Sequence, residues 1–369
     1  MNLLFYTPFN ARSRDTESLM EAFVKQGHRV LLLTQAEWGP YHEHCEKMGV
    51  EIHIYSILKK SPLLYILRHT WHLFMFCRKY RPAIVYAHLE TASLPAVLTQ
   101  PFIGAKVFAC RHIIDEAHLS GNRNFILICK IVYRLARNII VVSQHCKNFM
   151  IEKEKVASHK IRVIRLGYNF KLYKDPDEAE VNRIRSSYPC QLLLLTACRM
   201  VGPKRPEYAV QIAQKLREKK LDVKLLLLGQ GPDMDKLKAR IMEAGLVEFV
   251  FLLGFKDNIM DYLSACDVLV HPSILDSSSV IIKEAGLRER LVVACHGIGD
   301  VDEYLIDGQH ALLTSKENAV EEMTNCLADV YADRALIPKL GKALNEVVIK
   351  QFSILEILPE YDEIHQLNN

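Results

Sequence analysis

Two carboxylates stand eight residues apart in a stretch whose other residues favour anion binding. Asp276 is followed by the serine run Ser277–Ser279, and Glu284 comes eight residues after Asp276. The preceding segment Asp267–Val270 is short and apolar, as expected for a buried strand. Apolar residues then recur at helical spacing, at Val280, Ile281, Ala285 and Leu287. The stretch therefore predicts a strand, a loop carrying Asp276, and a helix that begins after the serines and carries Glu284.

The start of such a helix is suited to an anion. The first amide N–H groups of a helix have no acceptor within it, and the helix dipole places partial positive charge at the same end. We therefore expect the backbone of Ser277, Ser278, Ser279 and Val280 to bind an anionic group. A buried strand followed by an N-capped helix with two surface acids is the alternative interpretation of the same residues.

Two cations occur in a second loop. Arg199 and Lys204 follow the apolar strand pattern Leu192–Thr196, in a turn rich in glycine and proline. A guanidinium donates directional hydrogen bonds and an ammonium acts as a point charge, so the pair suits a diphosphate. Solvated charges in a loop before a helix are the alternative.

A tight glycine turn follows the next strand pattern. Gly229 and Gly231 come directly after Val223–Leu228, where the backbone can approach a base or a ribose. The third glycine of a dinucleotide-binding fingerprint is missing, so the sequence supports NAD binding only weakly.

In the first half of the chain, His112 is a candidate ligand-binding residue. It follows the strand pattern Ala105–Ala109, and ligands of open α/β sheets bind beyond the carboxyl ends of the strands. A histidine at this place can hydrogen-bond a sugar hydroxyl, although it can equally be a surface loop residue. Other side chains expected at strand ends are those of Pro8–Arg14, His88, Arg111 and Ser143.

No metal or zinc site is expected. Three Asp-x-Asp pairs occur, but the Asp233 pair opens a helix, the Asp175 pair lies in a linker and the Asp300 pair lies in a loop before a helix. Aspartate is favoured at helix starts for capping and dipole reasons. The ten cysteines are scattered without a Cys-x-x-Cys pair, which predicts reduced, structural thiols in the cytosol.

The chain has the length and the patterning of two α/β domains. It has 369 residues, half of them hydrophobic, and strand and helix patterns alternate along it. This order predicts doubly wound parallel sheets, with a first domain over 1–167 and a second over 168–350. The start of the sequence runs into a strand pattern without a basic leader, and no apolar run approaches the ~20 residues that span a membrane. We therefore expect a cytoplasmic protein without a signal peptide.

Charge is distributed unevenly between the halves. Residues 1–170 carry 23 Lys and Arg against 12 Asp and Glu, whereas the remainder carries 24 against 31. The segment Lys59–Arg81 reads as a basic, aromatic-rich helix, and no acid occurs from Ile52 through Leu89. It is interpreted either as an interfacial helix that contacts an anionic membrane or as a core helix with solvated basic ends. Nucleic acid is not expected as a partner, because no recognised nucleic-acid motif accompanies the charge.

Taken together, these residues resemble the retaining glycosyltransferases of the GT-B fold in family 4, the group 1 glycosyl transferases. The motifs that carry the resemblance run along nearly the whole chain: Gly27–Val30, Arg199 with Lys204, the Gly229–Pro232 turn, Leu253–Phe255, Pro272–Ser273, the pair Asp276 and Glu284, and Gly297–Gly308.

The resemblance implies two Rossmann-like domains facing a central cleft, with a final helix over 351–369 crossing back to the first domain. It implies that Arg199 and Lys204 bind the diphosphate of a UDP- or GDP-sugar, Glu284 its ribose, and Asp276 and His112 the transferred sugar. No metal or other cofactor is implied. The acceptor would be a glycan or a lipid-linked glycan in surface polysaccharide synthesis, at the inner face of the membrane.

This sequence departs from the family pattern at three places. Asp276 stands where the family usually has Glu, the serines replace the glycines that usually follow, and Phe9–Arg14 replaces the paired glycines after the first strand. A catalytically silent nucleotide-sugar-binding partner subunit is therefore an alternative. A nucleotide-sugar epimerase of the same fold is a further alternative, with less support from the motifs.

Overall fold

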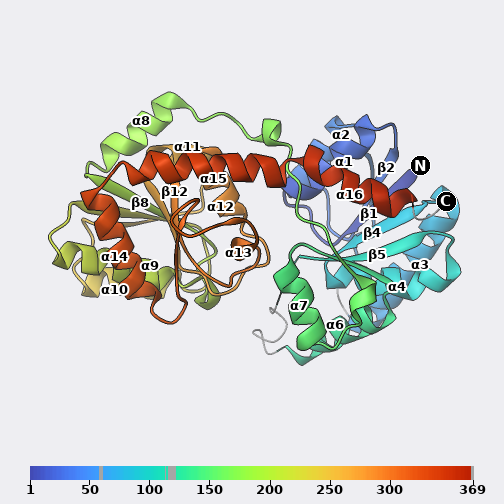
Figure 1. The fold of residues 1–369 in the computed structure, drawn as a ribbon. Helices are drawn as coiled ribbons and strands as arrows, with labels where there is room; N and C mark the ends of the chain where they lie inside the picture. The colour runs from blue at the N-terminus through green and yellow to red at the C-terminus, as the bar shows by residue number, and fades with distance from the viewer. Residues whose placement is uncertain (58–60, 113, 115–121, 367–369) are drawn as a thin grey trace. The chain divides into compact units, whose positions relative to one another are not determined.

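The computed structural model describes residues 1–57, 61–112, 114 and 122–366. The chain divides into two compact units, Met1–Leu172 together with Phe352–Asn369, and Tyr173–Gln351. Each unit contains one parallel sheet with helices on both faces (Figure 1). The predicted doubly wound α/β architecture is therefore confirmed in both halves of the chain.

The sheet of the first unit has seven strands in the order β3-β2-β1-β4-β5-β6-β7. The strands are β1 (Asn2–Thr7), β2 (Arg29–Thr34), β3 (Glu51–Ile54), β4 (Ile84–His88), β5 (Lys106–Arg111), β6 (Asn138–Val141) and β7 (Ile161–Val163). Strands β2 and β3 are added on one side of β1, and β4 to β7 are added in turn on its other side. The topological switch point, where ligands of such sheets bind, therefore lies between the carboxyl ends of β1 and β4.

Helices cover both faces of this sheet. They are α1 (Arg14–Lys25), α2 (Pro40–Lys47), α3 (Pro62–Tyr80), α4 (Glu90–Thr99), α6 (Arg123–Leu135), α7 (Gln144–Glu152) and α16 (Ile354–Gln366). Side chains alternate along β1, so Leu3 and Phe5 join a core with α1 and α16, whereas Leu4 and Tyr6 join a core with α3 and α4. Of the helix predicted over Lys59–Arg81, residues 59 and 60 lie outside the described part of the chain.

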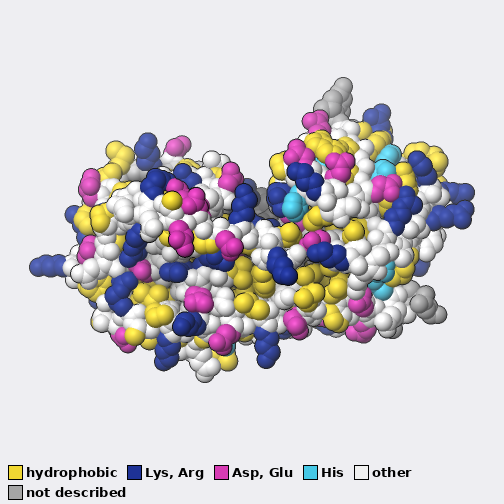
Figure 2. Space-filling view, turned by 90° about the horizontal axis from the view of Figure 1, so that it is seen from above, with side chains coloured by type: hydrophobic (Ala, Val, Ile, Leu, Met, Phe, Trp, Pro, Cys, Tyr) yellow, Lys and Arg dark blue, Asp and Glu magenta, His cyan; other side chains and the backbone are white. Residues whose placement is uncertain are grey.

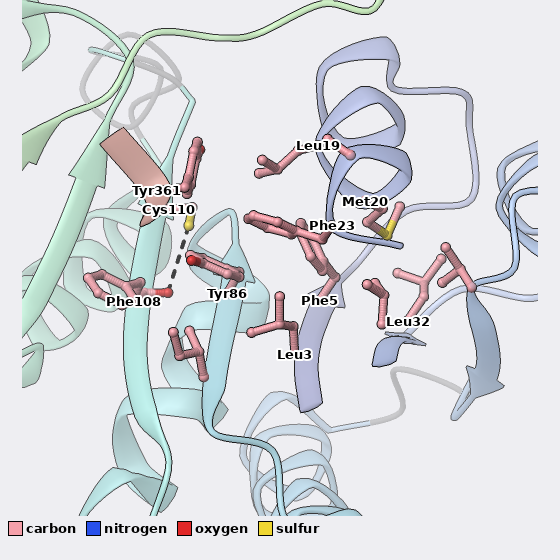
Figure 3. Packing of buried hydrophobic residues seen from close by; sticks show 14 of the residues in the cluster. Leu3, Phe5, Leu19, Met20, Phe23, Leu32, Tyr86, Phe108, Cys110 and Tyr361 are labelled. Carbon is pink, nitrogen blue, oxygen red and sulfur yellow. Dashed lines mark hydrogen bonds between the residues drawn. The ribbon is translucent and has the colours of Figure 1, made fainter. Parts of the chain in front are cut away.

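The last helix belongs to the core of the first unit. Figure 3 shows Tyr361 of α16 among the aromatic side chains of this core, near Cys110 and Tyr86. The Tyr86 hydroxyl lies 2.7 Å from His365 Nε2. The start of α16 is fixed to the loop after β7, since Ile354 N–H donates to Tyr168 O at 2.9 Å. Residues at the two ends of the sequence therefore fold as one unit.

The sheet of the second unit has six strands in the order β10-β9-β8-β11-β12-β13. They are β8 (Leu192–Ala197), β9 (Val223–Leu228), β10 (Val250–Gly254), β11 (Val268–His271), β12 (Leu291–Cys295) and β13 (Leu312–Thr314). The helices are α8 (Glu178–Ser187), α9 (Pro206–Glu218), α10 (Met234–Glu243), α11 (Ile259–Ala265), α12 (Val280–Leu287), α13 (Val301–Tyr304), α14 (Ala319–Ala332) and α15 (Leu336–Phe352). Here the switch point lies between β8 and β11, and the Thr196 hydroxyl joins these strands by donating to Val270 O at 2.8 Å.

Acidic and basic side chains are interspersed on the face shown in Figure 2. On this face, the unequal charges of the two halves of the sequence do not produce a surface of one sign.

Candidate functional site

The two loops at the switch point of the second unit are bonded to each other. The loop after β8 contains the short 3-10 helix Gly202–Lys204, and the loop after β11 runs to Ser279. Ile274 N–H donates to Pro203 O at 3.0 Å. Lys204 Nζ donates to Asp276 Oδ2 at 2.8 Å and to Leu275 O at 3.1 Å. The sequence placed Lys204 and Asp276 in separate motifs, and the fold brings them into direct contact.

Asp276 is held as a carboxylate. Burial favours the neutral acid, but the nearby Lys204 ammonium outweighs it, and the pKa of Asp276 is lowered from its ordinary value. The Ser277 amide adds a hydrogen bond to Asp276 Oδ1 at 3.0 Å. Lys204 carries three N–H groups, of which two are directed to Asp276 and Leu275, so a third can reach a phosphate oxygen.

The hydroxyls of Ser278 and Ser279 point into the protein. Ser278 Oγ lies 2.6 Å from Asp300 Oδ2, and Ser279 Oγ lies 3.2 Å from His271 Nε2. Both serines are buried. His271 is itself buried, and burial lowers its pKa to about 4, so the ring is neutral at neutral pH. A ligand can therefore bind the backbone amides of these two serines, because their hydroxyls are already hydrogen-bonded within the protein.

The start of α12 is the expected amide-rich end. Ser279 is the N-cap residue, but its side chain makes no capping hydrogen bond, because its hydroxyl faces His271. The helix begins at Val280, and its first amides have no acceptor in the preceding turn. Glu284 lies on this helix and is only 8% exposed, so it is not the surface acid of the alternative interpretation.

The glycines at 229 and 231 serve close backbone packing. A Cβ at Gly229 would lie 1.9 Å from Cys198 O, and one at Gly231 would lie 2.2 Å from Met200 O. Gly229 also has φ of +127°, which favours glycine. The turn after β9 therefore lies against the backbone on either side of Arg199, whose side chain is exposed.

His112 lies in the first unit, directly after β5. Its Nε2 is 2.8 Å from His88 Nδ1, and its Nδ1 is 3.9 Å from Asp15 Oδ2. His88 is stacked on Phe5, and burial together with His112 lowers its pKa well below the ordinary value. These polar side chains line a small pocket with Tyr361 of α16. His112 thus forms a pair with His88, which the sequence also placed at a strand end, and Asp15 is the residue that the structure adds.

The two other strand-end candidates have structural roles. Arg111 is 3% exposed and its guanidinium pairs with Glu154, with Nη2 3.1 Å from Oε1. Ser143 caps α7 by accepting from the Cys146 amide at 3.2 Å.

The acidic pairs also have partners within the protein. Asp177 caps α8 by accepting from the Ala179 amide at 2.9 Å, and Asp302 lies 2.7 Å from His296 Nδ1. Asp300 pairs with Lys283. Within the described ranges, no group of three or more His, Cys, Asp or Glu side chains is arranged to hold a metal ion.

Three residues around the serine run were not selected from the sequence. These are His271, Lys283 and Asp300. The sequence contained one signal for Lys283, because this lysine interrupts the apolar run from Val280 to Leu287. Its partner Asp300 lies 17 residues away, and only the fold reveals their contact.

Comparison with known proteins identifies both units. Residues 13–172 match the family described as Glycosyltransferase Family 4, and residues 191–333 match the family described as Glycosyl transferases group 1. An uncharacterized glycosyltransferase of Methanocaldococcus jannaschii is 23% identical over 84% of this chain and 86% of its own length. The GPI3 subunit of phosphatidylinositol N-acetylglucosaminyltransferase from Saccharomyces cerevisiae is 23% identical over 89% of this chain and 70% of its own length.

A solved structure shares the fold over its whole length. The crystal structure of Anabaena HepE in complex with UDP and glucose has a TM-score of 0.84 to this chain, with 17% sequence identity over 99% of each chain. At this identity the likeness concerns the fold alone. Together with the two family matches, it shows that the chain belongs to the glycosyltransferases of the GT-B fold, with a family 4 domain followed by a group 1 domain.

Proposed function

We propose that this protein is a retaining, metal-independent glycosyltransferase that moves a sugar from a UDP- or GDP-sugar to a glycan or lipid-linked acceptor in surface polysaccharide synthesis. The observation that carries the donor site is the contact of Lys204 with Asp276, 2.8 Å apart at the switch point and next to the amide-rich start of α12. HepE, which shares the fold, was solved with UDP and glucose.

In this proposal the second unit holds the donor. The diphosphate lies against the first amides of α12, with Lys204 and Arg199 supplying positive charge. Glu284 accepts hydrogen bonds from the ribose hydroxyls. Asp276 accepts from hydroxyls of the sugar that is transferred, and His112 contacts that sugar from the first unit.

The chemistry required of these groups is stabilisation of a leaving group. Negative charge grows on the diphosphate as the bond from the anomeric carbon to the phosphate oxygen breaks. Fixed ammonium, guanidinium and amide groups lower the energy of that charge without needing to reorganise. In this proposal the cations Arg199 and Lys204, together with the start of α12, provide the charge compensation for which other transferases use a divalent ion. This is the basis for proposing that no metal is needed.

We further propose that the acceptor is reached at a membrane surface. The yeast relative is a subunit of a phosphatidylinositol N-acetylglucosaminyltransferase by name. In this chain, α3 buries His69, Leu73 and Phe76 against the sheet but exposes an apolar stripe on its other side. The stripe consists of Leu63, Leu64, Leu67, Trp71 and Met75, each between 45% and 68% exposed.

Basic groups accompany this stripe. Arg68, Arg78 and Lys79 lie on the same helix, and the described residues from 52 to 89 contain no acid. An apolar stripe with cationic neighbours suits an anionic bilayer, because leucine and tryptophan enter the interface while the cations meet lipid phosphate. Among the described residues, no helix combines the length and the hydropathy needed to cross a bilayer.

The donor proposal is tested with a panel of UDP- and GDP-sugars and membrane lipid extract as acceptor. Transfer to the extract, with the anomeric configuration of donor and product compared by NMR and with turnover unchanged by EDTA, is the expected result. Inversion at the anomeric carbon, or loss of turnover with EDTA, contradicts the corresponding part of the proposal. Nucleotide-sugar binding without turnover supports a silent partner subunit, and interconversion of the free donor supports an epimerase.

A further inference from the structure

A buried ion pair lies beneath the serine run. Lys283 is on α12 and is 1% exposed, and the Asp300 side chain, in the loop after β12, is fully buried. Lys283 Nζ lies 2.6 Å from Asp300 Oδ2 and 2.8 Å from Ser278 Oγ. Ser278 Oγ lies 2.6 Å from the same Asp300 oxygen. The ammonium also lies over the Tyr304 ring, 5.1 Å from its centroid.

Stability alone does not account for this pair. Removing two charges from water is costly, and well-packed apolar residues at such positions often give an equally stable or more stable protein. A buried ion pair differs from an apolar contact in being directional, because each hydrogen bond fixes the position of its partner atoms. Here the partner that the pair fixes is the middle residue of the serine run.

The loop after β12 packs closely against the loop after β11. Gly299, which precedes Asp300, has φ of +52°, and a Cβ there would lie 2.7 Å from Ser277 O and 3.0 Å from Asp276 O. The loop after β12 therefore lies against the backbone of the loop after β11. A side chain at position 299 would displace the carbonyls next to the amides of the proposed donor site.

The segment Asp276–Ser279 is anchored at three of its four residues. Asp276 is held by Lys204, Ser279 by His271, and Ser278 by the Lys283–Asp300 pair. The first two anchors come from the loop after β8 and from β11. The third comes from α12 and the loop after β12, and it is the only one of the three that involves the loop after β12.

We propose that Lys283 and Asp300 are positioning residues that fix the serine run so that its amides and the start of α12 meet the diphosphate of the donor. The proposal rests on the donor site described under the proposed function and adds two residues to it. The pair is neutral as a whole and enclosed, so its contribution is to geometry rather than to attraction of the anion. Neither residue touches the donor.

The test removes both charges together. Lys283→Met/Asp300→Ala leaves no lone buried charge, so we expect it to remain folded, whereas either single substitution leaves an uncompensated charge and is destabilising. In the folded double variant, calorimetry is expected to show at least a 10-fold loss of UDP affinity. Hydrogen exchange of the amides from 276 to 282 is expected to become faster. Wild-type UDP affinity together with unchanged exchange would overturn the proposal.

A second variant covers the case in which the double variant does not fold. Ser278→Ala removes only the hydroxyl that the pair holds, and the matched control Thr324→Val removes a buried hydroxyl that bonds Val320 O within α14. We expect Ser278→Ala to weaken UDP binding and to raise loop exchange, while Thr324→Val changes neither. Equal behaviour of the two variants contradicts the inference.

A separate measurement on the wild-type protein distinguishes failure of the proposed donor site from failure of the positioning role. If the wild-type protein binds neither UDP nor GDP, the proposed function fails. Exchange of the loop amides then decides the inference alone, since faster exchange in the double variant supports positioning and unchanged exchange overturns it.

Discussion

Lys204 and Asp276 meet across two loops, with 2.8 Å between Nζ and Oδ2, although 72 positions separate them in sequence. The contact unites the cation expected to bind a diphosphate with the acid expected to bind a sugar. Each residue consequently depends on the other, because the ammonium keeps Asp276 ionised and the carboxylate orients Lys204.

Replacing Lys204 is expected to weaken nucleotide binding. Lys204→Ala removes the charged hydrogen-bond donor that we propose for the diphosphate and leaves Asp276 without its main counter-ion. Calorimetry should therefore show UDP affinity reduced roughly 10- to 100-fold. Lys219→Ala, an exposed lysine at the far end of α9, is the matched control and should bind as the wild type does. Equal affinity in both variants would remove Lys204 from the donor site.

The stability of the second unit is expected to fall in mild acid because of His271. Its pKa is about 4 in the folded protein, against roughly 6.5 when unfolded, so the unfolded state binds more protons between these values. Stability from this group is complete above pH 6.5 and decreases as the pH falls towards 4. Between pH 7.5 and 5 the loss amounts to roughly 2 kcal/mol.

Denaturant unfolding of the wild type and of His271→Gln at both pH values isolates this effect. The variant lacks the group, so the difference in unfolding free energy between the two proteins should change by about that amount. A difference that is the same at pH 7.5 and 5 would show that His271 does not titrate in this way.

The histidine pair of the first unit is expected to affect transfer rather than nucleotide binding. His112→Ala removes the hydrogen bond that we propose between His112 and the transferred sugar, so kcat/KM should fall about 10-fold while UDP affinity stays constant. His159→Ala, an exposed histidine of the same unit, provides the control. A drop in UDP affinity, or unchanged transfer, would contradict the role given to His112.

The two tryptophans allow membrane contact to be assigned to one helix. Trp71 is on the α3 stripe and is 65% exposed, whereas Trp38 is 49% exposed and stacks on His42. In Trp38→Phe, the remaining Trp71 should show a blue shift of its fluorescence with anionic vesicles, weakened by salt. In Trp71→Phe, the emission of Trp38 should not move. A Trp71 shift of equal size with neutral vesicles would contradict the preference for anionic lipid. The absence of any shift would contradict membrane contact by α3.

Gly229 and Gly202 should differ sharply in their tolerance of a methyl group. Gly229→Ala forces a Cβ onto Cys198 O at a φ that disfavours side chains, and a loss of about 2–4 kcal/mol in unfolding free energy is expected. Gly202 has open space around its Cβ position, so Gly202→Ala should be nearly neutral. Thermal or denaturant unfolding of both variants measures the difference, and similar stabilities would show that the turn after β9 can move away from Cys198.

The sequence determined the architecture because the relevant information is local. Alternating strand and helix patterns predict parallel doubly wound sheets, and both sheets have that form. The helix after Ser279 was also predictable, since apolar spacing reports which face of a helix is buried. The order of the motifs sufficed to identify the family.

The contacts between motifs were decided by the tertiary structure. Nothing in the sequence pairs Lys204 with Asp276, His112 with His88 or Lys283 with Asp300. The members of each pair are at least 17 residues apart, and only the fold brings them into contact. The sequence predicted that the backbone of the serine run faces a ligand, but only the fold shows that the hydroxyls of Ser278 and Ser279 are directed to Asp300 and His271. Residue type and spacing predict which elements form, but the direction in which a loop side chain points depends on what the fold places beneath it.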